Sequence, residues 1–137
     1  MLPEWLLLNC LNKLMSKKTI KVKRDTHIVD AKGMSLGRMA TKVALLLQGK
    51  QKPDYEKYRD AGDNVVVKNF DQIKITGNKL KNKIYYHHTG YLGGLKSIAL
   101  GDLIKKSPIK VLQLAVSRML PKNKLQARMM KRLKIEK

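Results

Sequence analysis

The residues best suited to bind another molecule lie in one stretch, residues 85–94, which reads Tyr-Tyr-His-His-Thr-Gly-Tyr-Leu-Gly-Gly. Tyrosine and imidazole rings offer flat faces and hydrogen-bonding tips, and the glycines let the backbone turn and come close to a partner. Beside lysines, these features are typical of a surface that stacks on bases and binds a phosphate backbone. A hairpin or strand end with half-buried tyrosines is the other interpretation, and the stretch alone does not separate the two.

The net charge of the chain favours nucleic acid. Its 137 residues include 30 Lys and Arg against 10 Asp and Glu, which gives a net charge of +20. Residues 72–137, which contain the Tyr/His stretch, hold 16 of the basic and 2 of the acidic residues. A compact domain with this charge repels itself unless a polyanion is near. Nucleic acid is the usual polyanion, and an anionic membrane surface is its main competitor.

Membrane binding is the weaker alternative. No apolar run approaches the ~18 residues that a spanning helix needs. A helix on the membrane surface would need an apolar face that is free to insert, whereas the amphipathic segments of this chain need theirs for a core. We therefore expect a nucleic acid and no membrane as partner.

Residues for catalysis or metal binding are scarce. Cys10 is the only cysteine, so neither a disulfide framework nor a thiolate metal cage is expected. His87 and His88 are adjacent on an extended segment and would point to opposite faces, which makes a poor chelating pair. Asp60 and Asp63 lie near turns, where local hydrogen bonding explains them. We expect no enzyme activity, no metal, no cofactor and no small-molecule substrate.

The positions of apolar residues predict an α/β fold. Residues 26–30 are predicted as a strand, followed by an amphipathic helix that begins after Ser35 as N-cap and stops at Gly49 in the left-handed conformation. Further strands are predicted at 65–67, 73–76 and 83–86, and helices at 100–106 and from Pro108 until Pro121. This order indicates helices flanking a small, partly parallel sheet.

Two of these segments are predicted to be deeply buried. The continuous run Val65 to Val67 is typical of a strand covered on both faces. The helix that begins at Pro108 is apolar almost all round, which indicates a buried helix.

A glycine loop precedes the first helix and could hold an anion. Gly33 and Gly37 are spaced as Gly-x-x-x-Gly, which is neither the dinucleotide pattern nor a phosphate loop. A nucleotide cofactor is therefore not expected. The backbone amides at the start of the helix could instead bind an RNA phosphate together with Arg38.

The two ends of the chain differ from its body. Residues 1–14 are predicted to be an extension or an over-called start before a natural start at Met15, with an idiosyncratic short helix as the alternative. Residues 15–137 then form one domain. Its basic tail, residues 122–137, is predicted to be one helix with Leu125, Met129 and Leu133 on its apolar stripe. A solvated helix is possible, but the sparse counter-charge favours phosphate contact.

Several short motifs resemble one known family in the order in which they occur. They are Val29-Asp30-Ala31, Leu36-Gly37-Arg38, Leu47-Gln48-Gly49-Lys50, Thr76-Gly77-Asn78-Lys79, residues 85–94 and Met119-Leu120-Pro121-Lys122. Over roughly residues 20–135 the chain resembles ribosomal protein thirteen of the large subunit. The resemblance implies a three-layer α/β domain with a basic C-terminal extension. It also implies a structural role in the ribosome, in the cytoplasm or an organelle matrix, bound to large-subunit ribosomal RNA beside neighbouring ribosomal proteins and joining early in assembly.

The resemblance and the local chemistry together give a candidate RNA-binding set. It comprises Arg38, Lys42, Lys50, Lys83, Tyr86, His87, His88, Thr89, Gly90, Tyr91, Gly93, Gly94, Lys122, Lys124, Arg128, Lys131, Arg132 and Lys134. The chain departs from the family at Asn123 to Arg128, where a glycine is lost and an arginine is displaced. A free-standing nucleic-acid regulator would share the charge but should show a base-reading module, and none is present.

Overall fold

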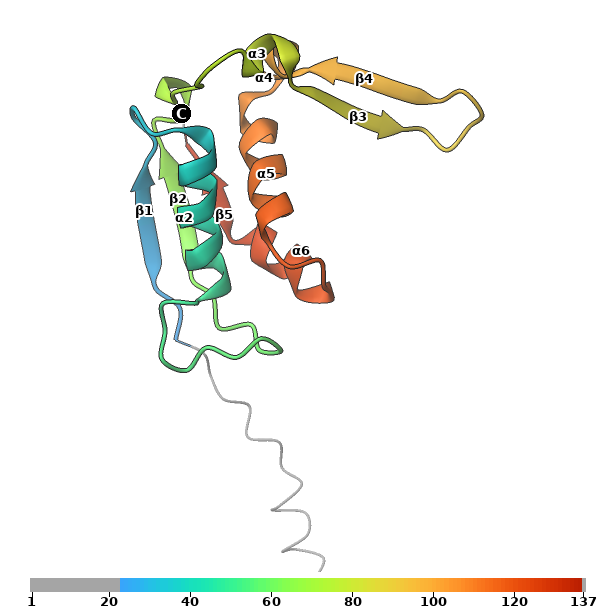
Figure 1. The fold of residues 1–137 in the computed structure, drawn as a ribbon. Helices are drawn as coiled ribbons and strands as arrows, with labels where there is room; N and C mark the ends of the chain where they lie inside the picture. Colours follow the sequence, from blue (N-terminus) through green and yellow to red (C-terminus); the bar gives the residue numbers. More distant parts are fainter. Residues whose placement is uncertain (1–22, 137) are drawn as a thin grey trace, which may run out of the picture.

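The main sheet of the protein is small and entirely parallel. The structure is a computed structural model that describes residues 23–136. Strands β1 (Thr26–Asp30), β2 (Asn64–Lys68) and β5 (Leu133–Ile135) lie side by side in the order β1-β2-β5 (Figure 1). Parallel neighbours need a crossover connection, and helix α2 (Leu36–Gln48) supplies it between β1 and β2. The predicted α/β fold with a small, mainly parallel sheet is confirmed.

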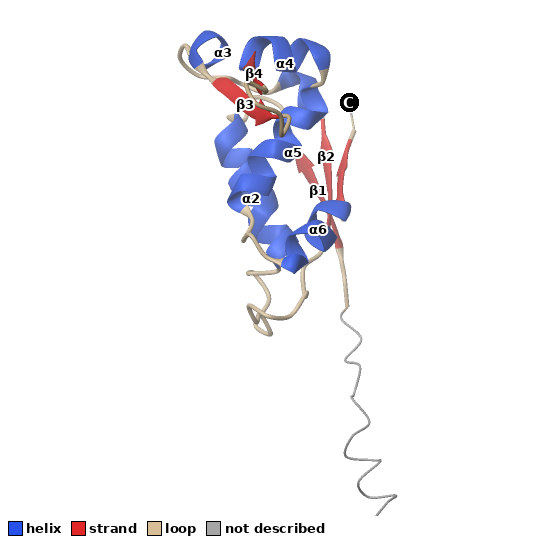
Figure 2. Ribbon diagram, turned by 90° about the vertical axis from the view of Figure 1, so that its right-hand side faces the viewer, coloured by secondary structure: helices blue, strands red, loops and turns tan. Residues whose placement is uncertain are grey.

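Helices pack on one face of this sheet and enclose the core. Figure 2 shows α2, α5 (Pro108–Met119) and α6 (Lys124–Lys131) on the same side of the strands. Leu47 of α2, Val65 of β2 and Leu112 of α5 are completely buried where these elements meet. Helix α5 buries one stripe, whereas Ile109 and Leu114 are only partly buried, so the expectation of burial all round is wrong.

The opposite face of the sheet is open. Ile28 stands beside Val66 in the register of β1 and β2, and its side chain is 65% exposed. Val66 itself is partly buried, and Lys134 beyond it is exposed. The expectation that Val65 to Val67 are covered on both faces is therefore wrong, because on this face Val66 is only partly buried beside the exposed Ile28. A third layer over this face is not seen within residues 23–136.

A second unit leaves the body as an arm. The chain passes from β2 through the short helices η1 (Phe70–Gln72) and α3 (Lys79–Asn82) into an antiparallel hairpin of β3 (Ile84–His88) and β4 (Leu95–Ala99). Helix α4 (Leu100–Lys106) returns it to α5. Figure 1 shows the hairpin projecting from the end of α5. Its root is anchored by a small core of Tyr85, Leu100, Leu103 and Val111.

The strand predicted at 73–76 does not form. Ile73 and Ile75 are partly buried and Lys74 and Thr76 exposed, so the alternation is real. Within residues 23–136, however, no strand runs alongside, and the only pairing of this segment there is an isolated bridge between Ser35 and Lys74. The two isoleucines instead pack against the two separate cores.

The helix ends agree in part with the prediction. Gly49 has φ of +76° and closes α2 in the left-handed conformation, and Pro108 occupies the first turn of α5. Ser35 and Ser107 occupy the N-cap positions, but neither side chain makes a capping hydrogen bond.

The predicted C-terminal helix ends early. Helix α6 stops at Lys131, and Leu133 to Ile135 then pair with β2 as a strand of the main sheet. Leu133 belongs to the core rather than to the stripe of a detached helix. The segment expected as a basic extension thus contributes a structural strand, which a local helical pattern could not reveal.

Replacing Leu133 by alanine tests this assignment. We expect Leu133→Ala to lower the free energy of unfolding by about 2–4 kcal/mol, because it leaves a cavity under the sheet. Lys134→Ala, on the exposed side of the same strand, is the control and should change it by less than about 0.5 kcal/mol. Urea denaturation measures both, and equal small effects would contradict a structural β5.

Candidate nucleic-acid interface

The Tyr/His stretch forms β3 and the loop of the hairpin arm. Tyr85 and Tyr86 are neighbours on an extended strand and so point to opposite faces. Tyr85 is buried at the root of the arm, whereas Tyr86 is 62% exposed. Tyr91 lies in the loop between the strands and is 80% exposed. The stretch is thus a hairpin, as one interpretation predicted, but two of its three tyrosine rings remain available to a partner.

The glycines of this loop serve the hairpin itself. Gly90 and Gly93 have φ of +93° and +70°, which other residues rarely adopt. A Cβ atom on Gly94 would lie only 2.0 Å from Oγ1 of Thr89. Thr89 donates its backbone amide to the Gly94 carbonyl at 3.0 Å and closes the loop. The tight turn therefore explains these glycines and holds Tyr91 outward.

The adjacent histidines lie on opposite faces of β3, as predicted. His87 stands opposite Lys96 and His88 opposite Leu95 in the register of the hairpin. Both imidazoles are exposed, and Nδ1 of His88 accepts a hydrogen bond from the backbone amide of Gly90 at 3.0 Å. His88 thereby orders the loop as well as remaining exposed.

A basic cleft of about 450 Å³ lies at the root of the arm. It brings together Arg38 of α2 and Lys83, both members of the predicted set. It also includes Lys74, Lys79 and Arg118, which sequence reasoning missed. Lys79 ends the motif Thr76 to Lys79, whereas Lys74 and Arg118 stand in no motif, and only the fold brings the three together.

The other predicted cations are distributed over the body. Lys50 lines a second hollow together with Leu120, Pro121 and Asn123. The remaining candidates on the helices and the loop after α5 are exposed, namely Lys42, Lys122, Lys124, Arg128 and Lys131. Lys134 is exposed on the open face of the sheet, away from the helices. The predicted set therefore surrounds the body rather than forming one flat surface.

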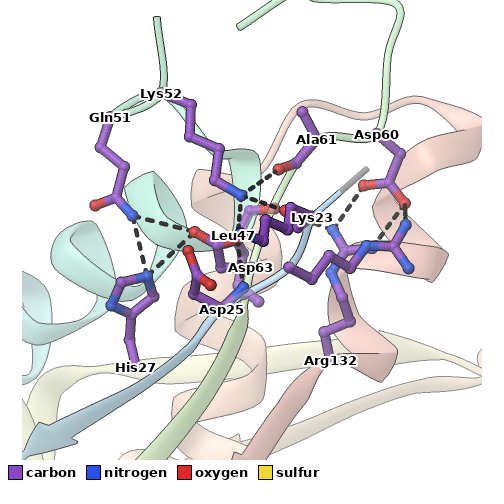
Figure 3. A network of polar contacts seen from close by, with 11 residues as sticks. Lys23, Asp25, His27, Leu47, Gln51, Lys52, Asp60, Ala61, Asp63 and Arg132 are labelled. Atoms are coloured by element: carbon purple, nitrogen blue, oxygen red, sulfur yellow. Dashed lines mark hydrogen bonds and ion pairs between the residues drawn. The ribbon is translucent and has the colours of Figure 1, made fainter. Parts of the chain in front are cut away.

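Arg132 has a structural role instead of the predicted RNA contact. Its guanidinium donates two hydrogen bonds to the carboxylate of Asp60, at 2.7 and 2.6 Å, and a third to the Leu47 carbonyl at 3.1 Å (Figure 3). The side chain is only 10% exposed. Because this fork is already bidentate to a carboxylate, we remove Arg132 from the candidate set.

Asp63 is the centre of the same polar network. Its side chain is completely buried, and its oxygens accept hydrogen bonds from Lys52, from Gln51 at 3.2 Å and from the Asp25 amide at 3.1 Å. Nε2 of His27 lies 3.1 Å from the same carboxylate (Figure 3). The expectation that Asp60 and Asp63 satisfy only local turns is therefore wrong, since their partners lie up to 72 residues away.

The network sits at the start of all three parallel strands. Asp25, Asp63 and Arg132 each lie just before a strand of the sheet, β1, β2 and β5 respectively. The backbone passes very close here, because a Cβ atom on Gly62 would lie 1.8 Å from the Leu47 carbonyl oxygen. This end of the molecule is thus held together by ion pairs and hydrogen bonds among its own residues. The arm lies towards the opposite end of the strands (Figure 1). The cleft is lined in part by Ser35 to Arg38, which follow the carboxyl end of β1.

The comparisons with known proteins agree with the fold and with the predicted resemblance. The sequence model of the family described as Ribosomal protein L13 matches residues 24–136. The chain belongs to the ribosomal protein L13 family. It is similar to the large ribosomal subunit protein uL13 of Teredinibacter turnerae, at 50% identity over 90% of this chain and 87% of that protein. The uL13 proteins of Vesicomyosocius okutanii and Geobacter sulfurreducens are each 52% identical, over 90% and 86% of this chain and 87% and 82% of theirs.

Two kinds of feature are not found among the residues that the structure describes. Within residues 23–136, no three His, Cys, Asp or Glu side chains are grouped so that they could hold a metal ion. None of the helices in this part of the chain is long and apolar enough to cross a membrane. The relatives are named as proteins of the large ribosomal subunit. The proposed non-family extension at 1–14 lies outside the described residues.

The departure from the family pattern at Asn123 to Arg128 has a structural explanation. Asn123 caps α6, and its Oδ1 accepts a hydrogen bond from the Gln126 amide at 3.1 Å. The side chain of Gln126 donates to the carbonyl of Ser117 at 2.6 Å and so ties α6 to α5. Arg128 remains exposed on α6. The altered residues therefore fix the helix while leaving a cation at its surface.

The ionisation of Asp63 should make the fold sensitive to acid. Burial acts to raise the pKa of this carboxyl, but hydrogen bonds from Lys52, the Asp25 amide and His27 outweigh it, so the pKa lies below its ordinary value of 3.8. A lowered pKa contributes stability above 3.8 that is lost as the pH falls through the folded-state value.

We expect Asp63→Asn to lower the free energy of unfolding by about 3–5 kcal/mol at pH 7, because Lys52 loses its buried partner. The variant should also lose stability less steeply below pH 4. Urea denaturation between pH 3 and pH 7 measures both effects. Asp71→Asn is the control, since Asp71 is exposed. An acid dependence in Asp63→Asn equal to that of the unaltered protein would contradict the assigned role.

Proposed function

We propose that this protein is a structural constituent of the large ribosomal subunit that binds large-subunit ribosomal RNA through its hairpin arm and basic surfaces. It would work beside neighbouring ribosomal proteins and support subunit assembly, in the bacterial cytoplasm or an organelle matrix. Membership of the L13 family supports the place in the large subunit. The contact with RNA rests on the arm and on the charge.

The observation that carries the proposal is the pair of exposed tyrosines on a projecting, basic hairpin. Tyr86 and Tyr91 are large rings that the fold leaves uncovered, and Lys83 and Lys96 lie on the same two strands or at their entry. An isolated two-stranded hairpin is only marginally stable in water. Aromatic faces beside cations suit unstacked bases and phosphates. RNA is therefore a partner that would cover the two tyrosine rings that the rest of the protein leaves exposed.

The remaining basic surface supports the same partner. The second hollow, with Lys50 at its edge, lies near Lys122 and the start of α6, where Lys124, Arg128 and Lys131 are exposed. A ribosomal RNA that folds around the protein can reach several faces at once, and each phosphate contact adds to a salt-dependent affinity.

Sedimentation distinguishes a ribosomal constituent from a free-standing RNA-binding protein. We expect the tagged protein from a cell lysate to migrate with large subunits in sucrose gradients at both low and high salt. A constituent held by many phosphates and by shape resists salt that removes a loosely bound protein. A slowly sedimenting pool that binds RNA only at low salt would favour the free-standing protein.

Removal of the ring at the tip of the arm tests its contact with RNA. We expect Tyr91→Ala to weaken binding to a large-subunit ribosomal RNA transcript by about 1–3 kcal/mol, roughly 5- to 150-fold in Kd, through lost stacking. Tyr58→Ala is a matched control, because Tyr58 is equally exposed but lies outside the arm. Filter binding measures the Kd of both variants. An equal Kd for the two would show that the Tyr91 ring does not contact the RNA.

A further inference from the structure

The basic cleft at the root of the arm has the size and the composition of a ligand site. Its volume of about 450 Å³ falls within the range of about 300–1,000 Å³ that is usual for such sites. Its floor is apolar and includes Leu36, Ile75, Leu100 and Ala115. A cavity that combines an apolar floor with a few polar groups is suited to a flat ligand that carries a charged group.

The rim of the cleft carries positive charge only. Five basic and no acidic residues line it, namely Arg38, Lys74, Lys79, Lys83 and Arg118. None of the five takes part in the ion pairs formed among the residues that the structure describes. Like charges collected around one cavity repel each other, and a bound anion relieves that repulsion.

Two of these cations are held in place by one aromatic ring. Nζ of Lys83 lies 5.4 Å, and Cζ of Arg118 5.1 Å, from the centre of the Tyr85 ring. Cation–π contacts of this length favour one position for an otherwise flexible side chain. Since the Tyr85 ring is itself buried, it offers both cations a fixed surface beside the cleft without any ligand.

Gly37 indicates where a ligand comes closest. It lines the cleft from the first turn of α2, and its backbone is not in the left-handed region. A Cβ atom at this position would meet no described atom within 4 Å. Glycine costs stability relative to alanine in the middle of a helix, and as the second residue of α2 Gly37 gives the helix no advantage over alanine. Neither conformation nor packing within residues 23–136 requires Gly37, whereas the close approach of another molecule would.

We propose that this cleft receives one unstacked nucleotide of the bound RNA. The base would lie on the apolar floor beside Gly37, and its phosphate among Arg38, Lys83 and Arg118. This inference rests on the proposed RNA binding and deepens it by assigning a pocket. RNA is favoured over an acidic protein segment because ribosomal RNA offers splayed bases joined to phosphates, and an arginine fork matches a phosphate.

The sharpest test fills the space above Gly37 without altering any charge. We expect Gly37→Ala and Gly37→Leu to keep or raise the melting temperature, because a helical glycine is replaced. We expect both to weaken binding to a large-subunit ribosomal RNA transcript, the leucine variant by about tenfold. Gln113→Ala, on the exposed side of α5 outside the cleft, is the control and should leave the Kd unchanged.

A second variant tests the cations. Arg118→Gln should raise the Kd and flatten its dependence on salt more than Lys110→Gln, which alters an exposed α5 cation outside the cleft. If the unaltered protein binds the transcript and the Gly37 variants bind equally well, the cleft is not an RNA pocket, although RNA binding stands. If the unaltered protein does not bind, both proposals fail. Gly37 variants that bind the transcript normally but no longer sediment with large subunits would overturn the RNA pocket in favour of a protein partner.

Discussion

The structure depends on a buried negative charge in a chain whose net charge is +20. The Asp63 carboxylate is removed from water, and such a charge is tolerated only when cations and hydrogen-bond donors surround it. Lys52, Gln51 and the Asp25 amide do so, and they come from the loop after α2 and from the residue before β1. Asp60 binds Arg132 in the same way just before β5. One cluster therefore fixes the beginnings of all three parallel strands, and the helices pack on a sheet that is already aligned.

This arrangement divides the cations of the protein into two groups. A few, such as Lys52 and Arg132, form ion pairs with buried or partly buried carboxylates and stabilise the body of the protein. Others line the cleft or lie on α6, and neither the cleft lining nor α6 contains an acidic residue. The cations that hold the strands together are therefore not the ones that line the cleft. Under the proposed function, RNA would neutralise the cleft cations without disturbing the ion pairs of the network.

Local patterns in the sequence were sufficient to predict some helices and strands but not others. Strand β1, helix α2 and the left-handed stop at Gly49 follow from spacing within a few residues, and they were predicted correctly. The strand β5 was not, because its pairing with β2 depends on residues far away in the chain, while its own sequence also suits a helix. Arg132 was assigned to RNA for the same reason, since its partner Asp60 lies 72 residues away. Arg118 and Lys74 belong to no motif, and only packing places them and Lys79 around one cavity.

The outer edge of strand β1 has a consequence for copies of the protein that have no partner. Strand β1 has one paired neighbour among the described residues, so its outer edge presents free backbone groups beside the exposed Ile28. Such an edge can pair with the same edge of another molecule and begin aggregation. Mutual repulsion between molecules of charge +20 opposes that encounter. The net charge would then keep partner-free copies of the protein in solution. A polyanion that neutralised this charge without covering β1 would cause the protein to aggregate.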